Sequence, residues 1–545
     1  YMDAKLKQDP RLYGTFVKDL WGSGMVSFTS NPQDLVTPFF VVKKNQRLRL
    51  ILDCRGMNRR FCPPPLALGS GSSWCQLSVP PGECLYIAQS DIKDYFYSLL
   101  LPESLRPLFS LPAIPADCLK RWGVGAEHWN GVDHEGWVFP MLRVVPMGWN
   151  WAMYLAQRVH QHQAMIGAGL GFDRVLVDNK APPDLSSGEP VILPYADNLN
   201  VTGLDKMRVQ QAKDGAVARL RELGFVVHAE MDAVDEAQSL GFHIDGRAGL
   251  VTPVAERLRR VILAFQWLSK RPKVAAKSVQ RLLGHAVHFM MVRCSLLSLM
   301  RGLYDFAQRA GRGRKRLWVG AAREARWISI LLRVCSADLT RPWSERVSAS
   351  DASLSGIAVC MRSAASHSVA EIGGTRENWR FKGRDPATRP RTVLVPPGDP
   401  FSDPTTVKPP NNVIHDPFEL NEHFSEVPSS FMDSEEWHLA FSSYMQYPES
   451  ITLLEGRGIV AALRHKARSL EAFGKRHLHL NDNLGMVLAA DKGRSSSMGI
   501  LQVCRRIACL QVALGAQLCC RWIPSEWNVA DAGSRRWEHL RRGHA

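Results

Sequence analysis

One tight polar step between two apolar runs constrains the fold of this chain more than any other stretch. The step is Tyr195-Ala196-Asp197-Asn198, and the runs occupy residues 191–193 and 199–201. Apolar residues on both sides of such a step predict a β-hairpin whose turn projects Asp197 from the edge of a sheet. A lone aspartate at this position is most often a turn former.

A second carboxylate upstream favours a different interpretation of Asp197. The run from Tyr86 to Tyr97 predicts a strand that ends near Asp91. If the two strands lie side by side, Asp91 and Asp197 form a pair able to hold two divalent cations, and Mg²⁺ (or Mn²⁺) suits such oxygen ligands. Two ions about 3.5–4 Å apart would clamp the attacking and leaving oxygens of a phosphoryl transfer, which is polymerase chemistry.

A basic hairpin precedes these carboxylates. Residues 38–44 and 48–53 are two β-type runs with a short polar link. Four cations gather at the tip: Lys43, Lys44, Arg47 and Arg49. Cations on a hairpin commonly protect an exposed edge strand. Followed by Arg55 and Asn58, they are also consistent with a clamp for a triphosphate, because Arg offers forked donors and Lys a point charge.

Residues 251–340 carry apolar positions at helical spacing, with basic residues along the connections. The densest basic run of the chain is Arg309 to Arg316. Such runs are most often solvated surface, and beside a polymerase they are also suited to contacts with a nucleic-acid backbone. The formal net charge of +16 is consistent with a polyanionic partner.

Four acids recur in the C-terminal part of the chain. Asp351 stands at a turn between two strand-like runs, Glu455 in a helical run, Asp482 at a strand end and Asp531 at a helix start. Each acid alone is typical of a protein surface. Together they predict a second two-metal site suited to phosphodiester hydrolysis, because converging like charges require cations to neutralise them.

Cysteine usage and hydropathy argue against a disulfide-stabilised, a zinc-binding and a membrane-spanning protein. Twelve cysteines in 545 residues are too sparse for a disulfide scaffold, and no Cys and His spacing fits a zinc site. The apolar stretch 282–303 carries His and Arg, which predicts a core helix pair rather than a membrane span. We therefore expect a soluble, intracellular protein without a membrane partner. The chain opens mid-pattern at Tyr1-Met2-Asp3, so we expect an excerpt of a longer polyprotein or gene model, and its oligomeric state stays open.

The order of these motifs resembles a known family. Residues 36–310 resemble the polymerase domain of a retroelement reverse transcriptase. The matching segments are Phe40 to Lys44, Leu48 to Asn58, Asp91 to Tyr97, Pro146 to Trp149, Tyr195 to Asn198 and Leu240 to Phe242. Residues 345–540 resemble the tethered ribonuclease H, and the run Asn528 to Arg535 is similar to that of gypsy-like and DIRS-like retrotransposons.

The resemblance implies an α+β, multidomain fold. It predicts an N-terminal extension at 1–35, fingers and palm at 36–250, thumb or connection helices at 251–340, and a ribonuclease H-like α/β domain at 341–545. The Pro-containing segment 362–450 is expected to be an irregular insertion. The implied partners are an RNA or DNA template, a primer, dNTPs and an RNA/DNA hybrid.

The resemblance also assigns roles to residues. Asp91 and Asp197 would bind metal in the polymerase, and Asp351, Glu455, Asp482 and Asp531 in the ribonuclease H, with two ions in each site. Lys44 (or Lys43) and Arg49 would contact the triphosphate, and Phe96 would exclude a ribose 2′-hydroxyl. Met147 and Gly148 would line the nucleotide pocket, and Leu240-Gly241 would grip the primer end.

One departure from the family pattern keeps an alternative open. Asn198 stands where the family usually has a second aspartate, although an Asn oxygen can still orient a water or ligand. The main hypothesis is an active RNA-directed DNA polymerase with ribonuclease H. The alternative is a catalytically impaired, retroelement-derived nucleic-acid-binding protein, and a third reading is a polymerase with a purely structural C-terminal unit. No aspartic-protease or integrase motif is present in this sequence.

Overall fold

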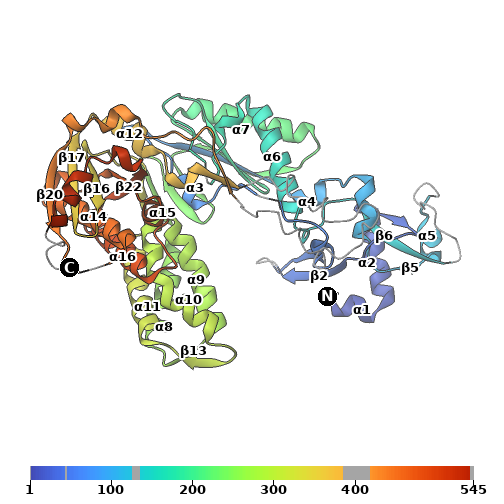
Figure 1. Cartoon of the computed structure of the whole chain (residues 1–545). Coiled ribbons are helices and arrows are strands. Elements are labelled where there is room, and N and C mark those ends of the chain that lie inside the picture. Colours follow the sequence, from blue (N-terminus) through green and yellow to red (C-terminus); the bar gives the residue numbers. More distant parts are fainter. Residues whose placement is uncertain are drawn as a thin grey trace, which may run out of the picture.

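The computed structural model describes residues 2–42, 46–64, 66–125, 136–178, 180–383, 418–447 and 449–539. Lys43 and Lys44, two of the predicted triphosphate ligands, lie outside these residues. The described chain is elongated, with the N-terminal elements at one end, a central sheet with a helical bundle beside it, and the C-terminal elements at the other end (Figure 1).

The central unit is a four-stranded antiparallel sheet in the order β7-β8-β4-β9. Its strands are β4 (Tyr86–Ile92), β7 (Val191–Tyr195), β8 (Asn198–Gly203) and β9 (Val227–Val234). Two long helices, α6 (Ala152–Ala168) and α7 (Lys206–Glu222), share a buried apolar cluster with one face of this sheet. The predicted hairpin around Asp197 is confirmed, because β7 and β8 pair directly across the turn.

The N-terminal unit joins two small sheets. Its helices are α1 (Ala4–Gln8), α2 (Pro10–Gly22), α4 (Tyr95–Ser98) and α5 (Asp117–Trp122). Its strands are β1 (Val26–Thr29), β2 (Thr37–Val42), β3 (Leu48–Asp53), β5 (Ile114–Pro115) and β6 (Trp137–Leu142). Helix α3 (Gly71–Trp74) lies apart from this unit, near the C-terminal elements (Figure 1), and contacts residues 291–300. The hairpin predicted for the basic segment is the β2–β3 pair, and the amide of Leu52 donates to the carbonyl of Met147, which connects this hairpin to the central unit.

A small sheet and a helical bundle follow the central unit. The sheet contains β10 (Glu236–Ser239), β11 (Phe242–Asp245), β12 (Leu250–Pro253) and β15 (Ala337–Asp338). The bundle contains α8 (Ala255–Lys270), α9 (Ala276–Met290), the 3₁₀ stretch η5 (Met291–Met300), α10 (Arg301–Arg309) and α11 (Val319–Leu331). A two-stranded ribbon, β13 (Lys273–Ala275) with β14 (Arg314–Arg316), lies at the end of the bundle away from α16 (Figure 1).

The stretch 276–309 is long and apolar enough to cross a membrane by length and composition alone. Half of its apolar window is buried inside the protein, and Arg293 interrupts the helical geometry within it. Side chains such as Leu283, Phe289 and Phe306 are fully or almost fully buried in the bundle core. The stretch therefore has the packing of the core helix pair predicted from the sequence.

The C-terminal unit is built on a five-stranded sheet in the order β20-β17-β16-β21-β22. Its strands are β16 (Arg346–Ala352), β17 (Gly356–Ser363), β20 (His438–Tyr444), β21 (Arg476–Asn481) and β22 (Gln517–Trp522). Its helices are α12 (Ser366–Gly374), α14 (Ile451–Lys466), α15 (Leu484–Lys492), α16 (Met498–Ala513) and α17 (Asp531–Arg535). The pairs β16–β21 and β21–β22 are parallel, and the other pairs are antiparallel.

The expected irregular insertion at 362–450 is shorter than predicted. Helix α12 packs in the apolar core of this unit, and β20 is the edge strand of its sheet. A further short pair joins β18 (Phe381–Gly383) to β19 (Phe418–Leu420). The prolines that suggested an irregular insertion lie outside these elements, because nine of the eleven between Pro386 and Pro448 stand in residues 384–417. Those residues lie outside the described part of the chain.

A buried ion pair fastens the chain near this segment to the sheet. Glu377 is fully buried and accepts hydrogen bonds from Arg521 Nε at 2.8 Å and from the Trp522 amide at 3.0 Å. Its second oxygen accepts from Arg380 Nε at 2.9 Å. Arg521, itself 1% exposed, also donates to the carbonyl of Ile372 at the end of α12. The pair thus ties β22 to the C-terminal end of α12 and to the 3₁₀ turn η7 (Glu377–Arg380) that follows it.

These units confirm the predicted fold class. The chain is α+β and multidomain, with a fingers-like, a palm-like and a helical thumb-like unit followed by an α/β domain of mixed parallel and antiparallel strands. The boundaries proposed between the units remain predictions.

The buried pair generates a stability prediction. Glu377→Ala leaves the Arg521 guanidinium buried without its carboxylate, so the free energy of unfolding of the C-terminal unit should fall by about 3–5 kcal/mol. Urea unfolding followed by far-ultraviolet circular dichroism measures this change. The matched control is Glu371→Ala on the exposed side of α12, which should change stability by less than about 0.5 kcal/mol. Equal effects of the two substitutions would contradict the role of the pair.

Candidate active sites

The strand register brings Asp91 and Asp197 together. Asp91 on β4 lies directly opposite Asn198, the first residue of β8. The amide of Ile92 donates to the carbonyl of Asp197 at 2.9 Å, so the tip of the hairpin is bonded to the end of β4. Burial, and then the nearby charge of Asp197, raise the pKa of Asp91 above its ordinary value, while His228 on β9 opposes the shift.

Asp91 has an oxygen suited to a cation. Its Oδ1 atom is buried and has no hydrogen-bond partner among the described residues. An unsatisfied buried carboxylate oxygen is costly unless a donor or a metal ion reaches it. Because carboxylate oxygens are the ligands that Mg²⁺ prefers, the donor set at Asp91 and Asp197 fits a divalent cation.

Two buried side chains of α6 form hydrogen bonds with the backbone of the hairpin turn. Gln157 donates to the carbonyl of Pro194 at 2.8 Å and accepts from the amide of Ala196 at 3.0 Å. His160 Nδ1 lies 2.6 Å from the carbonyl of Ala196. A carbonyl only accepts, so Nδ1 carries the proton, and burial lowers the pKa of His160 to about 4. The turn needs this support because Ala196 has a φ of +53°.

Asn198 takes a defined position beside the acid. Its Nδ2 atom donates to Asp197 Oδ1 at 2.9 Å. A neutral residue here adds no repulsion to the pair of acids, and its hydrogen bond orients the Asp197 carboxylate. The departure from the expected acid therefore leaves Asp197 in the hairpin and Asp91 on the neighbouring strand β4 as the acids of this site.

The predicted nucleotide-pocket residues lie where the fingers hairpin meets the central unit. Gly148 has a φ of +130°, and a Cβ atom there would lie 2.2 Å from the carbonyl oxygen of Leu52, so only glycine fits. Asn58 holds the same turn, because its Nδ2 atom donates to the carbonyl of Gly148 at 2.9 Å and its Oδ1 accepts from the amide of Asn150.

The other predicted polymerase residues lie on three separate elements. Arg49 is exposed on β3, next to Leu50, whose carbonyl accepts from the Tyr97 hydroxyl at 2.8 Å. Phe96 is half-buried on α4 and packs against the core of the N-terminal unit. Leu240 and Gly241 form the turn between β10 and β11, with φ values of +50° and +84°. The roles assigned to these residues remain predictions.

Three acids of the C-terminal unit converge from distant parts of the chain. Asp351 comes from the central strand β16, Glu455 from α14 and Asp482 from the end of β21. One carboxylate oxygen of each lies within 4.8 Å of the others, and within the described residues no other group of three such ligands is present. Asp351 is inside the strand rather than at the turn predicted from the sequence, because β16 continues to Ala352.

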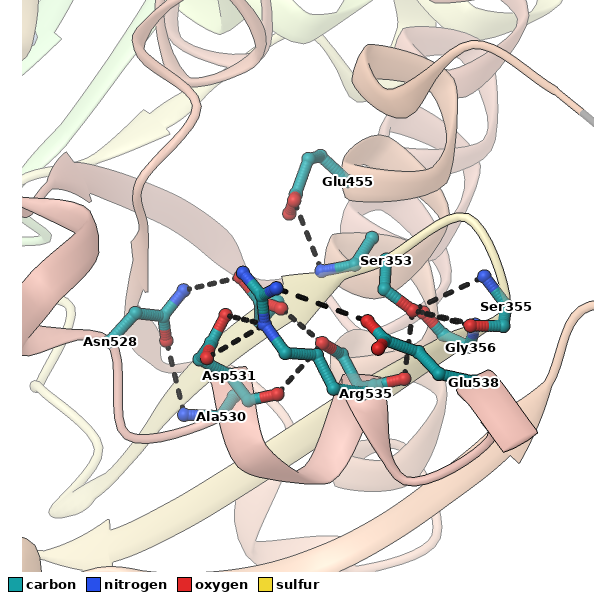
Figure 2. Close-up of polar contacts among 12 residues, drawn as sticks. Ser353, Ser355, Gly356, Glu455, Asn528, Ala530, Asp531, Arg535 and Glu538 are labelled. Atoms are coloured by element: carbon teal, nitrogen blue, oxygen red, sulfur yellow. Dashed lines mark hydrogen bonds and ion pairs between the residues drawn. The ribbon is translucent and has the colours of Figure 1, made fainter. Parts of the chain in front are cut away.

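Neutral donors fix the orientation of these carboxylates. Glu455 accepts from the Ala352 amide at 3.0 Å (Figure 2) and from Asn481 Nδ2 at 2.8 Å. Asp351 accepts from Asn528 Nδ2 at 3.1 Å and from the Ser534 hydroxyl. Burial raises the pKa of Asp351 to about 6 and that of Glu455 to about 8, and the Asp482 charge contributes to both shifts. Oxygen ligands that are buried, converging and short of positive charge fit divalent cations.

The fourth predicted acid lines the same cavity without joining the cluster. The cavity has a volume of about 610 Å³ and is lined by all four acids together with Arg535. Arg535 Nε lies 2.8 and 2.9 Å from the two oxygens of Asp531, and its guanidinium reaches towards Glu538 (Figure 2). Asp531 is therefore paired with a cation, whereas the other three acids are not.

Several residues at the two sites escaped the sequence analysis. The sequence carries no signal for the roles of Gln157 and His160, because polar residues at helical spacing are typical of a solvent-exposed helix face. Asn528 and Ser534 stand inside the run Asn528 to Arg535, and Asn481 directly precedes Asp482. Only the structure shows that Asn481 donates to Glu455 and that Asn528 and Ser534 donate to Asp351.

Comparison with known proteins agrees with a retroelement origin. Over 126 residues the chain is 30% identical to the Gag-Pol polyprotein of bovine immunodeficiency virus (strain R29), a match that covers 22% of this chain and 8% of the polyprotein. The chain thus matches a small part of that protein's length. No protein-family model matches the chain. The finer assignment to gypsy-like or DIRS-like elements remains a prediction.

Solved structures similar to this chain include two complexes of the foamy viral protease-reverse transcriptase. The complex with dsDNA has a TM-score of 0.44 at 12% identity and covers 96% of this chain and 84% of that one. The complex with an RNA/DNA hybrid has a TM-score of 0.41 at 12% identity and covers 99% of this chain and 78% of that one.

The acidic cluster generates a prediction about metal. At pH 8, Asp482→Asn removes a charge that repels Asp351 and Glu455, so the metal-free C-terminal unit should gain stability on the order of 1 kcal/mol. The same change should remove the stabilisation that 10 mM Mg²⁺ gives to this unit. Thermal unfolding with Mg²⁺ and with EDTA measures both effects, because a ligand that binds only the folded state raises its stability.

The control for this experiment is Glu471→Gln, an exposed acid of the same unit. It should leave both the metal-free stability and the response to Mg²⁺ unchanged. If Asp482→Asn responds to Mg²⁺ as fully as the unsubstituted chain does, the cluster does not hold the ion.

The support of the hairpin turn generates a second prediction. His160→Leu leaves the Ala196 carbonyl without its donor, at a cost of about 1.4 kcal/mol, so amide exchange in residues 195–198 should accelerate about tenfold. His160→Asn, which can keep a donor near the carbonyl, should accelerate exchange less. Hydrogen exchange read by mass spectrometry measures this, with β16 as the internal control. Uniform acceleration in both units would show general destabilisation instead.

Proposed function

We propose that this chain is an RNA-directed DNA polymerase of a retroelement with ribonuclease H activity on RNA/DNA hybrids. The observation that carries the proposal is the presence of two separate carboxylate sites, each assembled at the end of a central strand. Asp91 and Asp197 form one, and the cluster of Asp351, Glu455 and Asp482 forms the other. The similarity to a retroviral Gag-Pol polyprotein supports the same reaction class.

In the polymerase site, the residues of this chain would hold the cations, the hairpin turn and the incoming nucleotide in place. Asp91 and Asp197 would hold divalent cations, which when bound lower the charge barrier to attack of a primer 3′-hydroxyl on the α-phosphate. His160 and Gln157 keep the Asp197 turn in place during the reaction. Gly148 and Met147 would shape the pocket for the incoming dNTP, and Arg49 would contact its phosphates.

In the ribonuclease H site, the buried acids would hold the metal ions against a backbone phosphate of the RNA strand. Asn481, Asn528 and Ser534 keep the carboxylate oxygens aimed at one point, because each donates to an acid without neutralising it. Arg535 would release Asp531 when a further cation competes with its guanidinium for that carboxylate, or when a substrate phosphate competes with Asp531 for the guanidinium.

A second candidate function is nucleic-acid binding without turnover. The observation that favours it is Asn198, which donates to Asp197 at the position where the resemblance leads us to expect an acid. Under this reading the fold and the basic surface persist, and the metal sites have lost their chemistry.

A pair of substitutions separates these functions. On an RNA template with Mg²⁺, the unsubstituted chain should extend a primer, and Asp197→Ala should lower extension by at least about 10³-fold while hybrid cleavage persists, because a metal ligand contributes several kcal/mol to the transition state. Asp351→Asn should abolish hybrid cleavage and spare extension. A primer-extension gel and a labelled-hybrid assay measure the two activities.

Each outcome assigns a function. Absence of extension under varied metal, salt and template, with nucleic-acid binding retained, would support the impaired alternative. Loss of both activities by either substitution would contradict two independent sites. Extension without any hybrid cleavage would leave a polymerase with a structural C-terminal unit.

A further inference from the structure

A cavity of about 830 Å³ lies where the central unit, the helical bundle and the C-terminal unit meet. Its lining combines residues beside α3, residues of η5, the segment between β15 and β16, and residues around α12 and β22. Helices α3 and α15 both contact η5 at this junction (Figure 1). Pockets for small molecules span roughly 300–1,000 Å³. No acid of the two candidate active sites lines this cavity, which we call the junction cavity.

Four arginines of the junction cavity come from separate parts of the chain. Arg293 belongs to η5, Arg341 to the segment between β15 and β16, Arg376 to the turn after α12 and Arg476 to the start of β21. Arg376 has a close carboxylate, because its Nη2 atom lies 2.8 Å from Asp491 Oδ1. Arg341 Nε lies 3.9 Å from Asp338 Oδ2, which is beyond hydrogen-bond distance. Within the described part of the chain, Arg293 and Arg476 form no ion pair.

Neutral acceptors fix two of these guanidinium groups without cancelling their charge. Arg293 donates to the carbonyl of Gln511 at 2.8 Å. Arg476 is 8% exposed and donates to the carbonyl of Leu339 at 3.1 Å and to the Ser78 hydroxyl at 3.4 Å. The two groups are therefore held in place before a ligand binds, and the entropy cost of ordering them on binding is small.

The positive charge of the junction cavity is only partly compensated. Burial lowers the pKa of Arg293, Arg341 and Arg476, and the charge of Arg341 adds to the shift in the other two. Arginine stays protonated in proteins, so the lowered pKa values reflect the free-energy cost of holding these charges there. Two further acids of the lining leave this cost in place, because Asp184 and Glu371 are exposed to solvent, which screens their charge. An anion between the guanidinium groups would reduce the cost.

Buried polar atoms without a hydrogen-bond partner concentrate in the walls of the junction cavity. Among the described residues, seventeen side-chain nitrogen or oxygen atoms are buried and unpartnered, and six of them belong to residues of this lining. The six are Gln76 Oε1, Ser295 Oγ, Arg341 Nε, Trp379 Nε1, Arg476 Nε and Asp491 Oδ2. Buried polar groups are otherwise almost always bonded, so this concentration indicates an occupant with polar atoms. Three of the six are N–H donors, whose natural partner is an anion.

We propose that the junction cavity binds a small anion that carries two or more phosphate groups. The planar guanidinium of arginine binds phosphate through two parallel hydrogen bonds, and three such groups without a close carboxylate can engage more than one phosphate. Because Arg293, Arg341 and Arg476 belong to the bundle, to the connecting segment and to the C-terminal unit, the bound anion would hold these parts of the chain together. The inference goes beyond the proposed function and does not depend on it.

The first test measures binding of inorganic triphosphate to the full chain by isothermal titration calorimetry, in EDTA and at about 50 mM KCl, where screening is weak. The unsubstituted chain should bind this anion. Arg341→Gln should raise the Kd at least about tenfold, because it removes a charge-assisted hydrogen bond. Arg341→Lys keeps the charge without the planar fork and should raise the Kd less.

The matched control is Arg106→Gln in the N-terminal unit. The side chains of Arg106 and Arg341 are both 15% exposed, and each lies near an acid three residues earlier in the chain, Glu103 and Asp338. The control should keep the Kd of the unsubstituted chain. Equal melting temperatures of the variants and the unsubstituted chain establish that folding is intact.

A second measurement needs no substitution, so it decides the matter even if Arg341→Gln does not fold. Hydrogen exchange of the unsubstituted chain, read by mass spectrometry, should slow in residues 291–295, 338–343 and 374–379 when inorganic triphosphate is added, because the anion stabilises the packing of these segments. Residues 195–198 are the internal control and should exchange at an unchanged rate, since in EDTA no metal is present beside them to bind phosphate.

Further probes identify the source of the phosphate groups. Inorganic phosphate should bind more weakly than pyrophosphate, and pyrophosphate more weakly than triphosphate. Tighter binding of dATP than of inorganic triphosphate would assign a nucleotide to the junction cavity. Equal or weaker binding of dATP would assign an inorganic polyphosphate, and either outcome supports the proposal.

Four results would overturn the proposal: no binding of triphosphate, an unchanged Kd in Arg341→Gln, an equal rise of the Kd in Arg106→Gln, or slower exchange only outside the three segments. Loss of affinity for a DNA duplex in Arg341→Gln, without any binding of triphosphate, would assign these arginines to a nucleic-acid backbone instead.

The same experiments separate this inference from the proposed function. A chain that binds triphosphate through Arg341 but does not extend a primer keeps the inference and rejects the polymerase. A chain that extends a primer and binds no triphosphate in the junction cavity keeps the polymerase and rejects the inference. Asp197→Ala should leave the Kd for triphosphate in EDTA unchanged.

Discussion

The register of two central strands decides where the charges of this protein lie. Asp91 is opposite Asn198 in the antiparallel pair β4–β8, and Ser350, the neighbour of Asp351, is opposite Asn481 in the parallel pair β16–β21. Side chains alternate between the faces of a sheet, so a slip of one residue in either pair would turn the acid to the opposite face. Both candidate sites therefore depend on the buried apolar faces that fix these registers.

Burying the charged carboxylates of these acids costs free energy. The protein holds them in place with neutral hydrogen-bond donors, which do not cancel their charge. Raised pKa values at Asp91, Asp351 and Glu455 show that burial and mutual repulsion disfavour their charged forms. The groups that hold the sites are neutral donors, such as His160 at the Asp197 turn and Asn481 at Glu455. Donors of this kind fix geometry and leave negative charge available for cations.

Direct hydrogen bonds and ion pairs join the bundle to the C-terminal unit. Arg505 on α16 pairs with Glu324 on α11, and Glu324 also accepts from the amide of Leu303. Arg293 in η5 donates to the carbonyl of Gln511 at the end of α16 at 2.8 Å. The thumb-like helices and the α/β domain thus pack directly against each other, and β13 lies at the far end of the bundle (Figure 1).

The sequence by itself determined the hairpin at Asp197 and named Asp351, Glu455 and Asp482 among four candidate acids, because apolar runs around a polar step and acids at recurring positions are local signals. The fold class followed from the family that the order of the motifs resembles. Tertiary structure alone decided three things: that β20 and α12 belong to the C-terminal core, that Gln157 and His160 support the hairpin turn, and that Asp531 pairs with Arg535. These depend on contacts between residues far apart in the chain or on the geometry of a particular side chain, and no local pattern of residue types encodes them.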